Sequence, residues 1–149
     1  MTEVLINKIS TQSIDARGPR FSAALTSLVL ATALVTSNLW LTIAQAVVFA
    51  IGAIRGPQFT PYAYIFRKYI KPRLKGVPIF EDIRPPQFAQ SVGLLFALTA
   101  IAGASVGISP LFTIAVSFAL TAAFLNAVFN YCLGCELYLL ILRIRLPHG

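Results

Sequence analysis

Two long stretches without a charged side chain constrain this chain more than any other feature. No Asp, Glu, Lys or Arg occurs from Phe21 to Ile54, or from Pro85 to Cys135. A helix that crosses a bilayer needs about 20 apolar residues, so each stretch is too long for one such helix and suits two. Only 11% of the residues are charged, whereas soluble domains carry about 25%. The sequence therefore predicts an integral membrane protein.

Turn residues divide each stretch into two. Thr36-Ser37-Asn38 interrupts the first stretch and predicts helices over 20–36 and 39–55. Gly107-Ile108-Ser109-Pro110 interrupts the second and predicts helices over 87–106 and 110–131, because Pro favours the first turn of a helix. We expect the first of the four helices to be short. The predicted fold is an all-α membrane protein with four transmembrane helices in two hairpins.

The basic residues predict the orientation of these helices. All twelve Lys and Arg precede the first stretch, lie between the two stretches or follow the second. Loops rich in Lys and Arg stay in the cytoplasm, so we expect the N-terminus, the middle segment and the C-terminus to be cytoplasmic. The expected location is the cell (plasma) membrane, as a multi-pass protein without a cleaved signal peptide. We attribute the net charge of +7 to this topology and to anionic lipid headgroups rather than to nucleic acid.

A motif of Asp, Arg, Pro and Phe occurs twice with identical internal spacing, at positions 15–21 and again at 82–88. Each copy precedes a hairpin, and each hairpin is followed by a short aromatic and basic segment, 61–74 and 135–147. Such segments suit short helices that lie along the membrane interface. We predict a single membrane domain over 1–149, built from parallel repeats at about 14–75 and 81–146.

The repeated motif allows a structural and a functional interpretation. In the structural one, Asp15 and Asp82 cap the starts of the helices that follow them. In the functional one, both aspartates form a charged floor beneath the cysteines together with Arg17 and Arg84. These four residues are therefore candidate substrate-binding residues.

The two cysteines, Cys132 and Cys135, stand in the Cys-x-x-Cys spacing of redox dithiols. Gly134 weakens a helix between them, so a new helix would place Cys132 at its N-terminus, where partial positive charge favours a thiolate. We assign Cys132 as the attacking thiol and Cys135 as the resolving thiol. Glu136 disfavours a neighbouring thiolate, yet it is a candidate proton acceptor. Cytoplasmic cysteines are usually reduced, so we expect free thiols at rest rather than a structural disulfide.

Asn126 and Asn130 lie four residues apart, on one face of the predicted fourth helix. They either bond to a facing helix or line the approach to Cys132 as substrate-binding residues. Metal binding is a competing interpretation of the cysteines, but zinc normally takes four ligands, and His148 is the only histidine. A Cys₄ site would need two chains. We predict no metal and no cofactor.

Three groups of residues carry a further signal, namely Asp15-x-Arg17-Gly18-Pro19-Arg20-Phe21, then Glu81-Asp82-x-Arg84-Pro85-Pro86-x-Phe88-Ala89-Gln90-x-Val92-Gly93, and finally Asn126-Ala127 with Cys132-x-Gly134-Cys135-Glu136-x-Tyr138. Together they resemble the DUF4395 family of small, mostly actinobacterial integral membrane proteins of unknown function. The resemblance extends from about Asp15 to Arg145. Members are often encoded near thioredoxin-like or sulfurtransferase proteins, which implies thiol or sulfur chemistry with such a soluble partner.

The leading hypothesis is a membrane dithiol protein that exchanges redox equivalents or sulfur with a soluble thioredoxin-like or sulfurtransferase partner. The alternatives are a non-enzymatic scaffold or assembly subunit, in which the cysteines pack as small apolar side chains, and a small transporter subunit. Beyond the lipid bilayer and that soluble protein, a homodimer is the other partner that the sequence allows. Whether the protein is an enzyme stays open.

Overall fold

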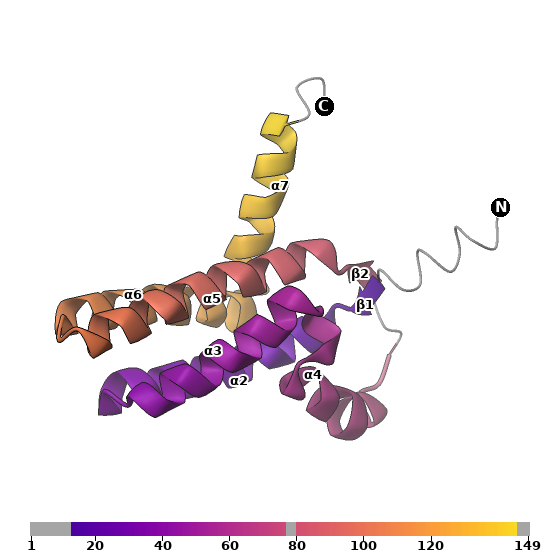
Figure 1. The fold of residues 1–149 in the computed structure, drawn as a ribbon. Helices are drawn as coiled ribbons and strands as arrows, with labels where there is room; N and C mark the ends of the chain where they lie inside the picture. The colour runs from indigo at the N-terminus through magenta and orange to yellow at the C-terminus, as the bar shows by residue number, and fades with distance from the viewer. Residues whose placement is uncertain (1–12, 77–79, 146–149) are drawn as a thin grey trace.

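Helices dominate the computed structural model, which describes residues 13–76 and 80–145 (Figure 1). The five longer helices are α2 (Arg17–Thr36), α3 (Leu39–Ile54), α5 (Arg84–Ser105), α6 (Ser109–Phe129) and α7 (Leu133–Arg145). Between the hairpins the chain forms η1 (Pro57–Phe59), α4 (Pro61–Ile65), the π-helical turn η2 (Phe66–Ile70) and η3 (Lys71–Arg73). Two short strands, β1 (Ser13–Asp15) and β2 (Phe80–Asp82), complete the described chain. The predicted all-α character is confirmed.

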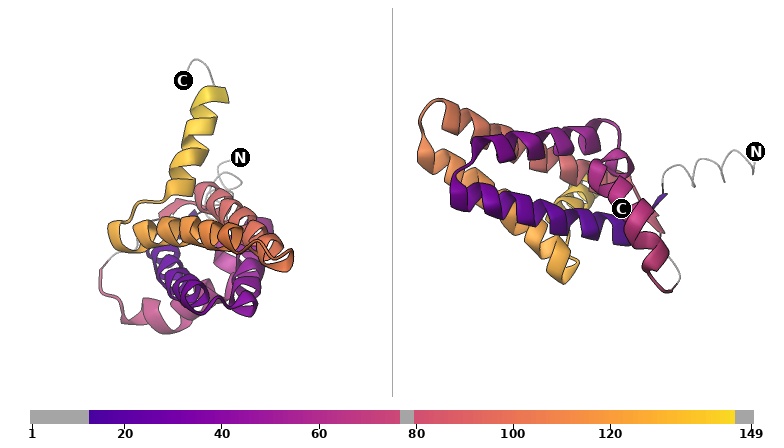
Figure 2. Two further views of the ribbon diagram at one scale, coloured as in Figure 1. Left: turned by 90° about the vertical axis from the view of Figure 1, so that its left-hand side faces the viewer. Right: turned by 90° about the horizontal axis from the view of Figure 1, so that it is seen from below.

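Four of these helices form an antiparallel bundle. Each packs against two neighbours, in the order α2, α3, α5, α6 and back to α2. Both hairpin turns lie at one end of the bundle, whereas β1, β2 and α4 lie at the other end (Figures 1 and 2). The starts of α2 and α5 therefore share one end of the bundle with the ends of α3 and α6.

Within residues 13–76 and 80–145, three helices are long and apolar enough to cross a membrane, namely α2, α5 and α6. The fourth bundle helix, α3, is also apolar, but its 16 residues make it shorter than the other three. We expected the first helix to be the short one, but α2 begins at Arg17 and reaches 20 residues. It starts earlier than predicted because Asp15 accepts a hydrogen bond from the backbone N–H of Arg17 at 3.0 Å.

The two predicted interruptions are confirmed, and each has its own turn chemistry. At the first, Ser37 adopts a left-handed conformation with φ of 51°. The Asn38 side chain then caps α3 by accepting hydrogen bonds from the backbone N–H groups of Trp40 at 2.9 Å and Leu41 at 3.3 Å. At the second, Gly107 has φ of 83°, which favours glycine.

Small side chains let the helices approach closely around a thin core. The buried core consists of Leu30, Ala46, Phe49, Ala97, Ala100, Phe112, Ala115, Val116 and Ala119. A Cβ atom on Gly103 would lie only 2.9 Å from Cβ of Leu111, so the close packing of α5 on α6 requires glycine there. Tight packing of this kind replaces the hydrophobic effect as the main force between helices in lipid.

The strands β1 and β2 pair antiparallel, which the sequence analysis did not predict. Ser13 pairs with Asp82, Ile14 with Glu81, and Asp15 with Phe80. Three-residue strands are too short to leave a recognisable alternation in the sequence. Their pairing brings the two copies of the repeated motif side by side at one end of the bundle.

Both aspartates of the repeated motif cap a helix start. Arg84 donates its backbone N–H to Oδ1 of Asp82 at 2.9 Å, as Arg17 does to Asp15. Each arginine side chain also returns to the same carboxylate, with Arg17 Nη2 at 2.8 Å from Asp15 Oδ2. The capping role that the sequence predicted is confirmed, although each aspartate stands one residue before the N-cap position.

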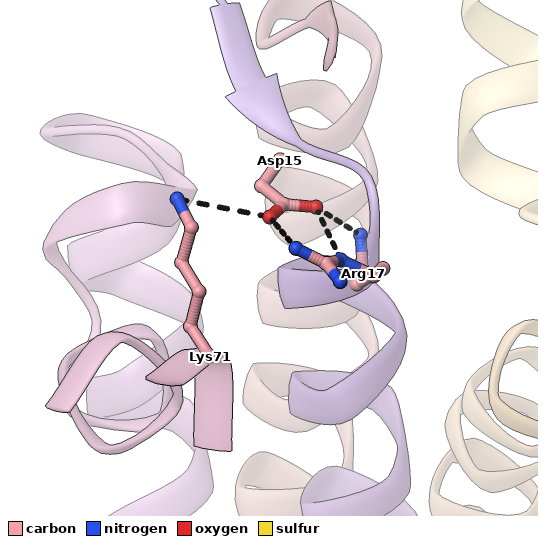
Figure 3. Close-up of polar contacts among 3 residues, drawn as sticks. All are labelled: Asp15, Arg17 and Lys71. Atoms are coloured by element: carbon pink, nitrogen blue, oxygen red, sulfur yellow. Dashed lines mark hydrogen bonds and ion pairs between the residues drawn. The ribbon is translucent and has the colours of Figure 1, made fainter. Parts of the chain in front are cut away.

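The two carboxylates differ in their surroundings. The Asp15 side chain is 6% exposed and lies 3.7 Å from Lys71 Nζ as well (Figure 3). The Asp82 side chain is 39% exposed and has Arg84 alone as its salt-bridge partner among the described residues. Hydrogen bonding from Arg17 lowers the pKa of Asp15, and hydrogen bonding from Arg84 lowers that of Asp82.

Replacing Asp15 by Ala should lower the free energy of unfolding by about 1–3 kcal/mol, because Arg17 and Lys71 lose their buried partner. Replacing Asp82 by Ala is the matched control and should cost less, since that pair is more exposed. Thermal unfolding in detergent would measure both changes. Because the pKa of each carboxyl is lowered in the folded state, this stabilisation exists above the ordinary Asp pKa and disappears as the pH falls through the folded value. Equal losses of unfolding free energy in the two variants would contradict the larger stabilising role that we assign to Asp15.

Candidate functional site

The Cys-x-x-Cys segment begins where α6 ends. Asn130 adopts a left-handed conformation with φ of 54°, and the backbone N–H of Tyr131 donates to the carbonyl of Leu125 at 3.2 Å. Asparagine tolerates this conformation better than other residues with a Cβ atom, so Asn130 suits a helix C-terminus. The chain then turns and α7 starts at Leu133. The predicted new helix directly after Cys132 is confirmed.

Cys132 and Cys135 are joined by a disulfide, with their Cα atoms 5.1 Å apart. The structure thus contains the oxidised form, where the sequence analysis expected free thiols at rest. The backbone N–H of Cys135 lies 3.1 Å from Sγ of Cys132 and donates to it. That N–H belongs to the first turn of α7, so in the reduced form the same geometry would stabilise negative charge on the Cys132 sulfur.

Gly134 brings this turn into direct contact with α5. A Cβ atom at Gly134 would lie 2.6 Å from both Cα and Cβ of Ala89. A backbone atom cannot move aside as a flexible side chain can, so only glycine permits this approach. Gly134 therefore has two roles. Its predicted role is to weaken the helix between the cysteines, and its second is to let the turn that carries them pack closely on α5.

A cavity of about 560 Å³ adjoins the disulfide and extends between the bundle helices. It collects most of the candidate site residues from the sequence, namely Cys132, Cys135, Glu136, Asn126, Asn130 and Asp82. The remaining candidates, Asp15, Arg17 and Arg84, do not line it. Of the four residues of the suggested charged floor, only Asp82 therefore reaches the cavity.

The polar candidates in this cavity are not used to hold helices together. Within the described residues, neither the Asn126 nor the Asn130 side chain forms a hydrogen bond to a facing helix. Asn126 is partly buried at the cavity wall, whereas Asn130 and Glu136 are exposed. Asn126 is thus the deeper of the two amides.

Arg20 is a residue of this region that the sequence analysis missed. From α2 it donates its Nε–H to the carbonyl of Ala127 at 2.9 Å and its Nη2–H to that of Val128 at 3.2 Å. These carbonyls lie in the last turn of α6 and have no partner in the helix, so a cation is favourable there. Arg20 thereby anchors the helix end that leads into Cys132. Arg20 lies within the repeated motif at positions 15–21, and this position could have indicated a role for it.

A buried polar chain was missed as well. Tyr62 donates its hydroxyl to Oε1 of Gln45 at 2.7 Å, and Gln45 Nε2 lies 3.4 Å from Oγ1 of Thr26, which lines the cavity. Gln45 is 1% exposed. Burial raises the pKa of Tyr62, so its hydroxyl stays protonated as a donor. Gln45 is the single amide side chain within α3, which could have indicated a buried partner.

Replacing Gly134 by Ala should displace the first turn of α7 from α5 and disturb disulfide closure, because the new methyl would collide with the backbone of Ala89. Gly18→Ala is the matched control, since a Cβ atom there would meet Phe66 at 3.4 Å, an ordinary contact. Redox titration of the cysteines would show a changed midpoint for the first variant and not for the second. An unchanged midpoint in Gly134→Ala would argue against the contact.

Replacing Arg20 by Ala should free the last turn of α6 and speed reduction of the disulfide by a soluble dithiol, because two carbonyl hydrogen bonds are lost. Each such bond contributes about 0.5–1.5 kcal/mol. Gln87→Ala is the control, because Gln87 Nε2 donates to the carbonyl of Ala53, at the end of α3 rather than at the end of α6. Stopped-flow reduction would compare the rates, and equal rates would remove Arg20 from the site.

Comparison with known proteins places the chain in a family without assigning it an activity. No curated protein and no solved structure gives a significant match. Residues 14–143 match the family described as "Domain of unknown function (DUF4395)". That match covers the bundle, the disulfide and nearly all of α7. The chain therefore belongs to the DUF4395 family.

Proposed function

We propose that the protein is a membrane dithiol–disulfide protein in which Cys132 and Cys135 exchange electrons or sulfane sulfur with a soluble thioredoxin-like or sulfurtransferase partner. The observation that carries this proposal is the disulfide at the start of α7, at the edge of a cavity between apolar helices. The backbone N–H of Cys135, directed at Sγ of Cys132, also supports the proposal, because it would stabilise a thiolate on that sulfur.

Exchange follows from this arrangement. A thiolate of the partner attacks Sγ of Cys132, forms a mixed disulfide with it and displaces Cys135 as a thiolate. The second thiol of the partner then attacks the partner's sulfur atom in the mixed disulfide and releases Cys132 as a thiolate. The N–H of Cys135 stabilises the charge on this thiolate. In the reverse direction Cys132 attacks first and Cys135 resolves. Glu136 is exposed beside Cys135 and accepts a proton from it.

The topology of four spans with cytoplasmic termini belongs to the same proposal. The 16 residues of α3 span about 24 Å, somewhat less than the hydrocarbon core of about 30 Å. The α3 helix packs between α2 and α5, which are long enough to cross, and the bilayer accommodates a short span by thinning locally. Every Lys and Arg precedes the first uncharged stretch, lies between the two stretches or follows the second. The chain enters and leaves both hairpins at the bundle end that holds β1 and β2 (Figure 1). That end then faces the cytoplasm, with the cysteines beside it.

Several contacts support two related halves. Ile14 and Glu81, which hold equivalent positions in the two copies of the repeat, pair with one another in the ladder. The Phe21 ring lies 5.8 Å from that of Phe66, and the Phe88 ring lies 5.5 Å from that of Tyr138, each in the segment after its hairpin.

The hydrogen bonds between the halves correspond as well. Arg20 of α2 bonds to the last turn of α6, and Gln87 of α5 bonds to the last turn of α3. Arg20 and Gln87 also hold equivalent positions in the two copies, each directly before the Phe of the motif. These pairs are what a two-fold axis along the membrane normal would produce.

The direction of α7 fits a helix on the membrane surface. It leaves the bundle across the direction of the other helices (Figure 1). Its exposed apolar residues are Leu133, Leu137, Leu139, Leu140, Ile141 and Ile144, and Arg143 and Arg145 stand near its end. Apolar residues beside arginines are typical of a helix that lies in the headgroup region.

The test is alkylation of the cysteines in membrane vesicles of known orientation, after reduction and again after mild oxidation. We expect a reagent that cannot cross the membrane to label Cys132 from the cytoplasmic face of the reduced protein, and oxidation to abolish this labelling. Cys135→Ser should trap a mixed disulfide between Cys132 and the partner, whereas Cys132→Ser should not. Slow labelling that oxidation does not change would leave a scaffold whose cysteines only pack.

A further inference from the structure

Thiol exchange with a soluble protein makes no use of the cavity beside the disulfide. Such a partner needs access only to the sulfur atoms at the bundle end. The cavity instead reaches Phe96 and Ala119, which lie near the middle of α5 and of α6. At a rise of about 1.5 Å per residue, these positions lie about 15–18 Å from the end of the bundle that holds the cysteines.

The inner walls of this cavity are mostly apolar and aromatic, with Thr26 as a polar exception. Phe49, Phe96 and Phe118 line it from α3, α5 and α6, and the rings of Phe96 and Phe118 stack with centroids 5.9 Å apart. The volume of about 560 Å³ falls in the range of small-molecule sites, about 300–1,000 Å³. An occupant that fits these walls is lipid-soluble.

Two amide side chains line the cavity from positions nearer the end of the bundle that holds the cysteines. Gln90 follows Ala89, whose backbone contacts Gly134 between the two cysteines. Its Oε1 is buried, and it has no hydrogen-bond partner within the described residues. Asn126 lines the same cavity from α6. An amide side chain both donates and accepts hydrogen bonds, so these two groups suit a ligand that alternates between carbonyl and hydroxyl oxygens.

We propose that the cavity binds a lipid-soluble quinone, which takes the two electrons released when Cys132 and Cys135 close their disulfide. The ring lies by the sulfur atoms with its oxygens near Gln90 and Asn126, and the isoprenoid tail follows the aromatic walls inward. This inference rests on the proposed function, because it names the second substrate of the same dithiol.

The reaction balances without a further reagent. Cys132 adds to the quinone ring as a thiolate and forms a carbon–sulfur bond. Cys135 then attacks the Cys132 sulfur, the sulfur–sulfur bond forms, and the carbon–sulfur bond breaks with its electron pair on the ring. The two thiol protons end on the two ring oxygens. Two thiols and one quinone thus become one disulfide and one hydroquinone. A soluble dithiol then reduces the disulfide again.

The test uses the full chain, reduced and reconstituted in lipid nanodiscs, with ubiquinone-1 as the probe, because its fully substituted ring does not alkylate thiols permanently. We expect a rate of thiol oxidation that saturates with quinone concentration, and one hydroquinone formed for each disulfide. The same quinone should oxidise the thiols of the chain unfolded in detergent much more slowly. Equal rates for the folded and the unfolded chain would overturn the proposal.

Two variants with a matched control locate the site. Ala123→Phe fills the cavity and Gln90→Leu removes the buried amide, so each should lower the rate per unit quinone concentration by at least about tenfold. Ala102→Phe adds the same volume at an exposed position of α5 outside the cavity and should match the natural chain. Oxidation by glutathione disulfide checks that the thiols of each variant still meet. If glutathione disulfide does not oxidise Ala123→Phe, that variant is uninformative, and Gln90→Leu then tests the site.

The outcomes separate this inference from the proposed function. If a soluble dithiol reduces the Cys132–Cys135 disulfide and quinone does not reoxidise it, the quinone proposal is wrong and the proposed function stands. If neither reagent reacts, both are wrong. Quinone oxidation that both Ala123→Phe and Gln90→Leu leave unchanged would show that the reaction does not use the cavity, and would also overturn the proposal.

Discussion

The structure depends on one constraint, which is that a helix in lipid must satisfy its polar groups within the protein. Along the helices the backbone does this by itself, but every helix end leaves N–H or carbonyl groups without a partner. This chain meets the demand with side chains from its own helix starts. Asp15 and Asp82 accept from the first backbone N–H groups of α2 and α5, while Arg20 and Gln87 donate to the last carbonyls of α6 and α3.

These end contacts also surround the candidate site. They gather at the end of the bundle that carries the ladder of β1 and β2, and the disulfide lies beside them. The opposite end consists of two tight turns at Ser37-Asn38 and Gly107. A backbone that is firmly held at one end leaves room for a cavity between helices whose core consists largely of alanines. The candidate site thus lies among the contacts that join the helix ends, and not in a separate loop.

The sequence predicted the features that depend on local composition. The two uncharged stretches located the bundle helices, and turn residues located their interruptions to within a few residues at each boundary. Gly134 predicted the start of α7. These features follow from solvent and backbone preference, which act on neighbouring residues. The features that the sequence did not reveal depend on distant residues, such as the pairing of β1 with β2, the contact of Arg20 with α6, and the chain from Tyr62 to Thr26. No local pattern records which helix a polar side chain will meet.

The contact between Gly134 and Ala89 has a mechanical consequence for α7. Because the first turn of this helix rests directly on the backbone of α5, the disulfide cannot open by swinging α7 away without breaking that contact. Opening and closing are therefore confined to side-chain rotation within one turn. In the proposed exchange, a partner would then distinguish the two redox states by the half-buried sulfur itself, because the surface around it would keep its shape. If the protein works as proposed, the change between its two redox states is local, and the bundle holds the disulfide rigidly.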